Sequence, residues 1–556
     1  MADTVSTQLK TRTYNKWAKN DTLEDYSLRY APKSFSKWSM YGVASAALGG
    51  IAYLADFAIG GSVAIAYGFS NALAAIIVAA VIIFATSVPI AYYSSKYKID
   101  MDLLTRGAGF GYLGSTLTSV IYASFTFIFF SLEGSIMAQA ITALIHTPLR
   151  VSYLIAALVI IPFVIFGMTL LAKLQVWTMP LWLLLLFGPF IAMAIADPSA
   201  FPGFVHFGGN SASGSAFTLV GTGAGAGVIL SLIAQIGEQV DYLRFMPDKT
   251  KENARGWWTA VLAAGPGWVI LGALKQLGGA FLAYFVFTKV GPALADDPIQ
   301  QYEAALRTFV APAALGVGFF FVFMSQIKIN VTNAYSGSLS WSNFFSRILH
   351  WHPGRVVWIF FNVGIALALM EANVFSFLNN VLNFYSNVAI AWIGAVCADL
   401  VINKPLKLSP GFIEFKRAHL YNFNPVGFGS MMIASVISIV AYYNAFGADA
   451  KAFSPLIALV IALVLAPLFA WITKGKYYIA RKDELEPPPL TADGLMSDAE
   501  LACVVCGDAF ERPDMAACSF HEGVICSLCC SLDSACHDSC KKTASGPVDL
   551  GIPTVA

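Results

Sequence analysis

Long apolar stretches separated by short polar segments repeat along most of the chain. Most of them reach the roughly 20 residues that a helix needs to cross a bilayer. They lie at about 38–67, 71–94, 114–146, 151–170, 174–196, 217–243, 257–288, 308–334, 355–371, 374–399, 427–446 and 453–473. The alternation of apolar and polar positions that marks a strand is absent, and backbone groups in lipid must be paired inside helices or closed barrels. The pattern predicts an all-α polytopic membrane protein with twelve transmembrane helices.

The composition agrees with this prediction and excludes a soluble globular chain. Hydrophobic residues make up 57% of the 556 positions and charged residues only 12%, where soluble domains have about a quarter charged residues. The net charge of +1 says nothing about partners, because the basic residues are informative through their distribution rather than their sum, and the sequence shows no footprint for nucleic acid. The lipid bilayer is therefore the expected surrounding.

Basic residues are distributed unevenly among the polar segments. The N-terminal segment, residues 1–37, holds seven of them, and most others follow even-numbered spans. The opposite loops hold only Arg150, Lys289, Arg307 and Lys451. Because basic residues near span ends stay on the cytoplasmic side, both termini are expected in the cytoplasm, and the protein in the cell (inner) membrane. No cleavable signal peptide precedes the first span, which is expected to act as its own insertion signal.

The composition changes abruptly after the membrane domain, residues 38–475. A charged, proline-rich linker is predicted at 476–497, a cysteine-rich module at 498–545 and a tail at 546–556. Eight of the nine cysteines fall in the module. Four pairs have zinc-ligand spacing: Cys503 and Cys506, Cys518 and His521, Cys526 and Cys529, and Cys536 and Cys540.

These pairs predict two structural zinc ions, because each pair can place two ligands on one tetrahedral metal. A disulfide framework also fits an even number of cysteines, but cytoplasmic thiols stay reduced. Which pairs share an ion is open, and Cys530 and His537 are left as extras. So short a segment has little core, so metal binding is expected to drive its folding. The ligand sets look complete, which argues against a catalytic zinc and against an enzyme.

Glycines gather in two of the predicted spans. The first span contains Gly49, Gly50, Gly60 and Gly61, and the sixth contains Gly221, Gly223, Gly225 and Gly227. If spans 1–5 and 6–10 form inverted repeats, followed by two extra helices, these two spans occupy matching positions. Interrupted helices at matching positions indicate a central binding site. The alternative is that the glycines serve close helix packing.

Six charged side chains fall within or near the ends of predicted spans: Asp56, Glu133, Glu238, Asp241, Lys275 and Lys328. Such groups are costly in a membrane and usually functional. Glu133 and Lys328 lie deepest and are favoured as functional. For Asp241 and Lys275 the alternative is a position near a span end, with the charge reaching the interface, and for Asp56 an outer vestibule.

Phe129 and Glu133 are four residues apart, on one face of the predicted third helix. A ring that stacks on a flat ligand and a carboxylate that accepts from its edge suit a heteroaromatic solute. Asn330 and Asn333 add amides that donate and accept. Gln235 and Glu238 in the sixth span are expected opposite them, and hydrogen bonds that only hold helices together are the alternative.

Two motifs give these residues a family context. "NAYSGSLSWSNFF" after the eighth span and "VDYLRFMP" at the end of the sixth resemble stretches of the nucleobase:cation symporter-1 family, over about residues 20–475. The resemblance implies a leucine-transporter-type fold and a secondary active transporter for a purine- or nucleobase-like solute. In that family a tryptophan and a glutamine stand where this chain has Phe129 and Glu133, so the two substitutions put the identity of the ligand in doubt.

The resemblance also implies a hypothesis about the coupling ion. Hydroxyl residues of the family that help bind sodium are replaced here by Lys328 and Ile329 in "QIKIN". Lys328 is then expected to take the place of the sodium ion beside the broken first helix, as a fixed cation or a proton carrier, which makes transport independent of sodium. The cysteine-rich tail resembles the connector of permease-type sensor kinases, so the alternative function is a solute sensor that signals through its zinc module to a kinase-type partner.

Overall fold

The computed structural model describes residues 25, 27–33, 38–486, 497 and 499–542. Most of the predicted N-terminal segment 1–37, about half of the linker 476–497, and the tail 546–556 lie outside the described residues, as do the ends of the cysteine-rich module. The boundaries of these segments stay predictions.

Helices occupy all twelve predicted ranges. Nine helical stretches among the described residues are long and apolar enough to cross a membrane by themselves: Phe69–Tyr97, Ser115–Ile145, Thr169–Ala196, Leu219–Leu243, Ala254–Lys289, Pro298–Leu349, Val374–Asn403, Pro425–Tyr442 and Ser454–Thr473. The other three ranges contain shorter helices, namely α1 (Met40–Gly49) with α2 (Ala55–Tyr67), α6 (Leu149–Leu158) with α7 (Ile161–Ile165), and α16 (Arg355–Glu371). The helical membrane fold is confirmed, whereas the number of twelve crossings stays a prediction.

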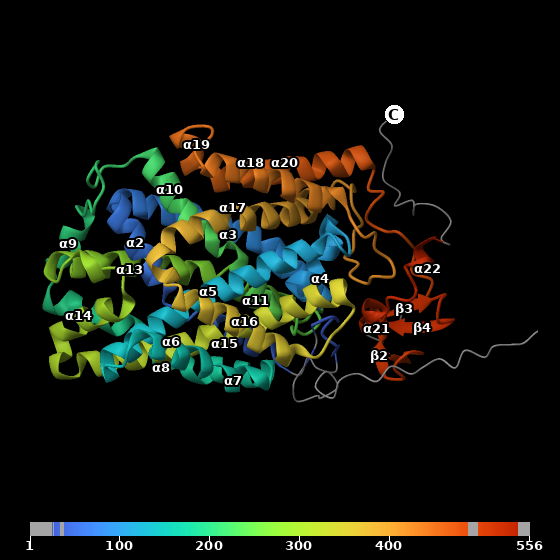
Figure 1. The fold of residues 1–556 in the computed structure, drawn as a ribbon, viewed down its shortest axis with the longest axis horizontal. Helices are drawn as coiled ribbons and strands as arrows, with labels where there is room; N and C mark the ends of the chain where they lie inside the picture. Colours follow the sequence, from blue (N-terminus) through green and yellow to red (C-terminus); the bar gives the residue numbers. More distant parts are fainter. Residues whose placement is uncertain (1–24, 26, 34–37, 487–496, 498, 543–556) are drawn as a thin grey trace, which may run out of the picture.

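The membrane domain is a bundle whose helices run mostly along the long axis of the molecule (Figure 1). Its main elements are α3 (Phe69–Tyr97), α4 (Met101–Thr105), α5 (Ser115–Ile145), α8 (Met168–Ala196), α9 (Ala200–Val205), α10 (Leu219–Ile229), α11 (Gln235–Leu243), α12 (Ala254–Ala264), α13 (Trp268–Lys289), α14 (Pro298–Val310), α15 (Ala314–Leu349), α17 (Leu378–Ala398), α18 (Ser430–Tyr442), α19 (Ala448–Ala452) and α20 (Ser454–Thr473). Short 3-10 and π segments join several of them: η3 (Arg106–Phe110), η4 (Leu230–Ala234), η5 (Pro292–Leu294), η6 (Ala311–Ala313), η7 (Val374–Phe377), η8 (Asp399–Asn403) and η9 (Pro425–Gly429).

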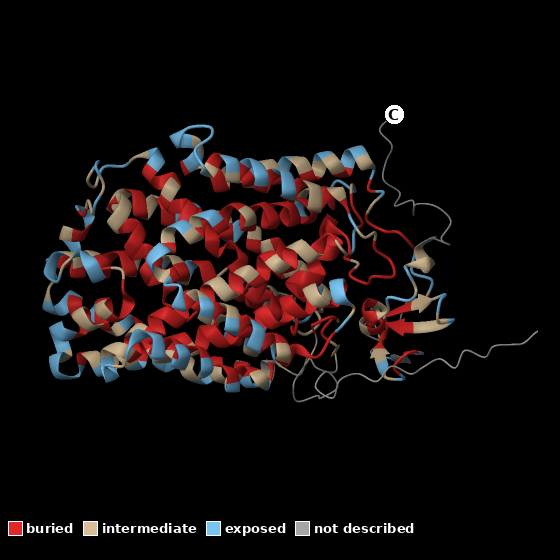
Figure 2. Cartoon of the chain, viewed as in Figure 1, coloured by how far each residue is buried: buried red, intermediate tan, exposed pale blue. Residues whose placement is uncertain are grey.

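Burial separates the centre of the bundle from its periphery (Figure 2). The most apolar windows of the stretches Leu219–Leu243 and Val374–Asn403 are 78% and 83% buried, whereas that of α20 is only 22% buried. The sixth and tenth predicted spans therefore lie inside the bundle, and the twelfth faces the surroundings. A central position for the sixth span is what a binding site between two repeats needs.

The first span is interrupted, as its glycines predicted. The chain leaves the helix between α1 and α2, at residues 50–54. A Cβ on Gly49, the last residue of α1, would come within 2.4 Å of the Cβ of Gln175, so the glycine allows α8 to pack directly against the end of α1. Both explanations for the glycines, a helix interruption and close helix packing, therefore apply at this place.

The sixth span changes its helix type after the glycine run rather than within it. Residues 219–229 form α10, the five residues of η4 tighten to a 3-10 helix, and α11 follows. A Cβ would come within 3.0 Å of a neighbouring side chain at Gly223, Gly225 and Gly227. Close packing therefore explains these glycines, and the irregular backbone lies one turn further along.

The cysteine-rich module is small and lies at one end of the bundle, next to α4 and opposite α9 and α14 (Figure 1). Strand β1 (Glu500–Ala502) pairs antiparallel with β2 (Ala509–Glu511), and β3 (Met515–Cys518) pairs antiparallel with β4 (Gly523–Cys526). The short helices are η10 (Arg512–Asp514), α21 (Ser527–Leu532) and α22 (Ser539–Lys542). Its small core consists largely of cysteines with Val505, Met515 and Ile525, which agrees with the expectation that metal supports its folding.

Candidate functional site

The interruption of the first span carries two free helix ends in the interior of the bundle. Helix α2 begins at Ala55, and the Glu133 carboxylate of α5 accepts hydrogen bonds from the backbone N–H groups of Leu54 (3.2 Å) and Ala55 (3.0 Å). Glu133 is fully buried. An anion at a helix N-terminus satisfies orphan N–H groups and is stabilised by the helix dipole. Glu133 therefore fixes the start of the second half of the first span.

An ammonium group holds the other side of the interruption. Lys275 of α13 donates from Nζ to the carbonyl oxygens of Ile51 (2.7 Å) and Tyr53 (2.8 Å). Its Nζ lies 2.9 Å from Oδ2 of Asp56, and 3.6 Å from the centroid of the Tyr53 ring. The side chains of Lys275 and Asp56 are 1% exposed or less. The alternative that these two residues lie near a span end or in a vestibule is wrong, because they pair inside the bundle.

Close contact between α2 and α13 lets Lys275 reach the interruption. A Cβ on Gly60 would stand 1.9 Å from the carbonyl oxygen of Gln276, and one on Gly279 would stand 2.3 Å from the carbonyl oxygen of Phe57. The two helix backbones therefore touch. The Gln276 side chain donates to Oδ1 of Asp56 at 2.7 Å, so Asp56 is held by two neighbouring residues of α13.

The predicted partner in the sixth span lies in the same region. Glu238 is fully buried, and Gln235 donates to its Oε2 at 2.6 Å. Tyr53 interacts electrostatically with Glu133 and with Glu238, so both predicted carboxylates lie in the neighbourhood of the interruption. The remaining oxygen of Glu238, Oε1, has no hydrogen-bond partner among the described residues.

The predicted amides of the eighth span lie on one face of α15. Asn333 donates to Oδ1 of Asn330 at 3.1 Å. Nδ2 of Asn330 and Oδ1 of Asn333 are buried without a hydrogen-bond partner in the described part of the chain. Gln326 precedes Asn330 by one helical turn and interacts with Glu133. This stripe thus presents unpaired donors and acceptors to α5.

Phe129 is buried one turn before Glu133, and its ring packs on Phe125 with 4.5 Å between the ring centroids. Asp241, which the sequence left between two interpretations, is buried and accepts hydrogen bonds from Tyr122 at 2.9 Å and from Ser336 at 2.6 Å. Asp241 lies near the end of its span, and its carboxylate bridges α5, α11 and α15 rather than extending away from the bundle.

Lys328 is buried in the bundle, as expected from the sequence, but its ammonium group meets a different helix. Its Nζ donates to the carbonyl oxygen of Gln175 (2.9 Å) and to Oγ1 of Thr178 (2.7 Å), both in α8. The carbonyl groups of the interruption are bonded by Lys275 instead. The expected contact of the Lys328 ammonium group with the broken first helix is thereby corrected: the group bonds Gln175, whose side chain packs on Gly49.

Sequence reasoning missed the roles of Tyr53, Lys275, Gln276 and Gln326. For Lys275 a signal existed, because an opposite charge, Asp56, lies in another apolar span and intramembrane charges usually pair with one another. No comparable signal existed for Gln276 and Gln326, because an uncharged amide in an apolar span marks no particular partner.

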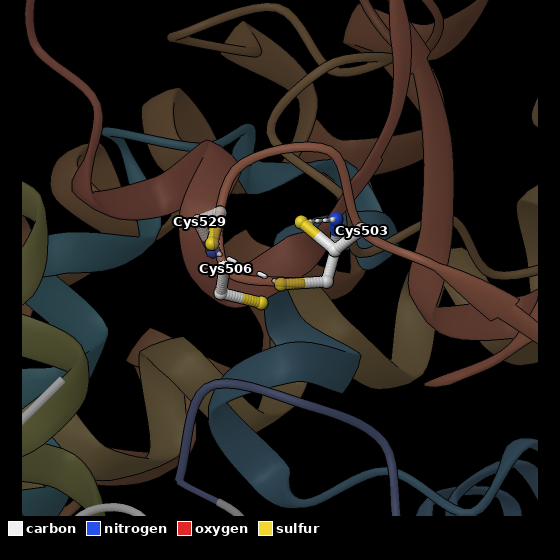
Figure 3. Close-up of side chains that lie close together, drawn as sticks. Cys503, Cys506 and Cys529 are labelled. Atoms are coloured by element: carbon white, nitrogen blue, oxygen red, sulfur yellow. Dashed lines mark hydrogen bonds between the residues drawn. The ribbon is translucent and has the colours of Figure 1, made fainter. Parts of the chain in front are cut away.

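The cysteine-rich module contains a candidate metal centre. One ligand atom from each of Cys503, Cys506, Cys526 and Cys529 lies within 4.8 Å of the others, and all four residues are buried. Figure 3 shows Cys503, Cys506 and Cys529 turned toward one another. The backbone N–H groups of Cys526 and Cys529 donate to the sulfurs of Cys503 and Cys526, at 3.4 Å each. Four thiolates at this spacing suit one tetrahedral metal ion.

The other predicted ligands lie around a second small cavity of about 20 Å³, which Cys518, His521, Cys536 and Cys540 line together with Cys530. Nε2 of His521 lies 2.6 Å from Oδ2 of Asp533, and its Nδ1 is buried without a partner among the described residues. Among those residues, the ligand atoms of this second set do not gather as tightly as the first four.

Polar contacts join the module to the membrane domain. Arg417, in the loop after η8, pairs with Asp538 (3.0 Å) and donates to the carbonyl oxygen of Cys530 (2.8 Å). Arg481 donates to the carbonyl oxygen of Ala517 at 2.6 Å. The second cavity is therefore bordered by residues that the membrane domain holds in place.

A family model described as permease for cytosine/purines, uracil, thiamine and allantoin matches residues 30–465. A search of curated proteins finds no match.

Among solved structures, the chain is similar to Mhp1, a nucleobase-cation-symport-1 family transporter, in a closed conformation with bromovinylhydantoin bound. That match has a TM-score of 0.61 and 16% identity and covers 82% of this chain and 96% of Mhp1. The inward-facing conformation of Mhp1 matches with a TM-score of 0.58 and 16% identity, over 80% of this chain and 93% of the other. A Na⁺-coupled sialic acid symporter in a substrate-bound outward-open state matches with a TM-score of 0.56 and 11% identity, over 82% of this chain and 93% of the other.

Proposed function

The chain belongs to this permease family, and on that premise we propose that it is a secondary active transporter for a flat, nucleobase-like solute. The family comprises transporters rather than enzymes. Cytosine, uracil and allantoin, among its described substrates, and the hydantoin bound to Mhp1 are small rings with both N–H donors and carbonyl acceptors, and the proposed solute shares this chemistry.

One observation supports a solute site between the first, third, sixth and eighth predicted spans. Glu238, Asn330 and Asn333 keep polar atoms buried and without partners in the part of the chain that the structure describes. A buried polar group that lacks a hydrogen bond costs about 1–3 kcal/mol. A bound ring with donors and acceptors along its edge would supply the missing bonds.

The proposed roles follow from the positions of these side chains. Phe129 supplies the ring on which the solute stacks. Glu238, Asn330 and Asn333 bond its edge, while Gln235 holds Glu238 through the 2.6 Å hydrogen bond. Glu133 does not bond the solute directly but holds the start of α2 in place, because both of its oxygens already accept hydrogen bonds from backbone N–H groups there. The solute would then reach this site alternately from the two sides of the membrane.

Binding is tested on the purified full-length protein by thermal shift with cytosine, uracil, adenine, hypoxanthine, allantoin and hydantoin. At least one is expected to raise the melting temperature. Glu238→Gln should weaken that binding at least tenfold, because a carboxylate acceptor is lost. Glu371→Gln, at an exposed position, is the matched control. Absence of a shift with every compound would count against a nucleobase-like solute.

Transport is tested with the same protein in liposomes and a radiolabelled form of the compound that binds. Accumulation inside the vesicles supports the permease. Binding without accumulation would favour the alternative of a solute sensor. The family and the similar solved structures argue for transport, since they are transporters.

The orientation proposed from the basic residues places the protein in the cell (inner) membrane, with both termini in the cytoplasm. The first described residues support a common side, since Arg29 lies over the Phe510 ring of the module, 4.7 Å from its centroid. Labelling of single cysteines introduced near residue 20 and residue 490 by an impermeant reagent tests this placement. Reaction in intact cells would contradict it.

The module is proposed to bind two zinc ions in an interleaved arrangement. The first and third pairs form the four-cysteine group, which leaves Cys518, His521, Cys536 and Cys540 for the second ion. Asp533 would orient His521 from outside the ligand set, as carboxylates do at many zinc sites. Metal analysis of the full-length protein should give two zinc ions per chain, and one for Cys536→Ser. The Cys530→Ser variant should still bind two zinc ions per chain. If it binds only one, Cys530 rather than His521 is a ligand of the second ion.

A further inference from the structure

We infer that the Lys275 ammonium permanently occupies the cation position at the interruption of the first span, so that the transport cycle takes no sodium ion there. This inference rests on the proposed transport function and concerns its coupling. It assigns to Lys275 the role that the sequence suggested for Lys328.

The position is one that favours a cation. At an interrupted membrane helix, the carbonyl groups that end the first half lack helical partners and form the negative end of the helix dipole. Transporters of this architecture use such carbonyl groups to coordinate a coupling ion. Here the carbonyl oxygens of Ile51 and Tyr53, two non-helical residues between the end of α1 and the start of α2, point at one nitrogen, and the carboxylate of Asp56 lies beside them.

The ammonium group of Lys275 is fully used by this set of oxygens. It has three N–H donors, and three oxygens lie within 2.7 to 2.9 Å of Nζ. The face of the Tyr53 ring covers the group from another side, at 3.6 Å, where a cation is favoured. No donor is left to bind a solute, so Lys275 is a positioning residue rather than a solute ligand.

The backbone contact between α2 and α13 makes the arrangement stable. Gly60 and Gly279 bring the two helices so close that a methyl group would not fit between them. Lys275 therefore cannot withdraw far without separating the two helices. A diffusing ion would leave the position in each cycle, whereas a side chain on a packed helix stays.

Lys328 does not compete for this position. Its ammonium group is bonded to Gln175 and Thr178 of α8. It therefore serves as a matched control, because it is also a lysine buried in the membrane domain but lies outside the interruption.

The test uses sodium itself as the probe and needs no solute. Melting temperatures of the full-length protein are compared in NaCl, KCl and choline chloride at equal ionic strength. The wild-type protein is expected to melt at the same temperature in all three salts. Lys275→Ala removes the ammonium and leaves Asp56 and the two carbonyl groups, so this variant is expected to be stabilised by NaCl over choline chloride by several degrees. Lys328→Ala should show no such difference.

Each outcome decides the inference. Sodium-specific stabilisation of the wild-type protein would overturn it. So would a folded Lys275→Ala variant that responds equally to all salts, because Lys275 would then be only structural. If Lys275→Ala is not recovered, Lys275→Gln replaces it, with a smaller sodium response expected because its amide still bonds one carbonyl group. Failure of the nucleobase-binding assay would leave these results unaffected, so the two proposals fail separately.

Discussion

Replacing Glu133 by glutamine tests the idea that this carboxylate fixes the start of α2. The carboxylate accepts two backbone N–H groups, those of Leu54 and Ala55, at 3.2 and 3.0 Å. A glutamine amide has one oxygen, so one N–H group would face the amide's own N–H₂ and lose its partner. A hydrogen bond to a charged group contributes about 1.5–3 kcal/mol, and the charge at a helix N-terminus about 0.3–1 kcal/mol.

Together these terms give a loss of about 2–4 kcal/mol in the local stability of the interruption. At about 1.4 kcal/mol per factor of ten, amide hydrogens in residues 50–58 should exchange with deuterium roughly 30 to 1,000 times faster. The assay is hydrogen–deuterium exchange with mass spectrometry on the full-length protein in nanodiscs, where local opening is read from individual peptides.

The matched control is Glu371→Gln. Glu371 pairs with Arg150 at 3.6 Å, and the side chains are 37% and 85% exposed, so its loss should change stability by at most about 1 kcal/mol. The reasoning is refuted if Glu133→Gln folds and its exchange in residues 50–58 stays within threefold of wild type.

Three further predictions follow from contacts elsewhere in the molecule. Gly60→Ala should prevent recovery of folded protein, because its methyl group would overlap the Gln276 carbonyl group. Gly316→Ala, with no atom within 4 Å of the added carbon, is the control and should be recovered normally. Fluorescence-detected size-exclusion chromatography compares the amounts of folded protein. Cys503→Ser should lower the bound metal by one ion per chain in metal analysis and speed proteolysis of the module, while Cys397→Ser should change neither. Burial raises the pKa of Asp514 from its ordinary value of 3.8 to about 7, against the opposing charge of Arg29, so stability is lost progressively as the pH rises from about 4 to 7. Asp514→Asn should therefore melt higher than wild type at pH 8 and by a clearly smaller margin at pH 5, and an equal difference at both values would contradict this.

The helical spans could be predicted from the sequence because each depends on the hydropathy of one local stretch. The interruption of the first span was also visible, since Gly49 and Gly50 mark where the helix stops and where α8 approaches. The spacing within each cysteine pair is likewise a local property, and it pointed to Cys503, Cys506, Cys526 and Cys529, which the structure gathers in one buried cluster.

Only the tertiary structure decided which charged group meets the interruption. Lys275 and Ile51 are 224 positions apart in the sequence, and hydropathy carries no information about which two helices touch. The sequence favoured Lys328 because it stands where the resembling family has sodium-binding hydroxyl residues, yet its ammonium group bonds α8, while the glycines of α2 and α13 bring Lys275 to the carbonyl groups. The same holds for the cysteines: spacing gives the pairs, but only the packing of the β1–β2 turn on β4, where the Val504 N–H donates to the carbonyl oxygen of Val524 at 2.9 Å, brings the first pair to the third.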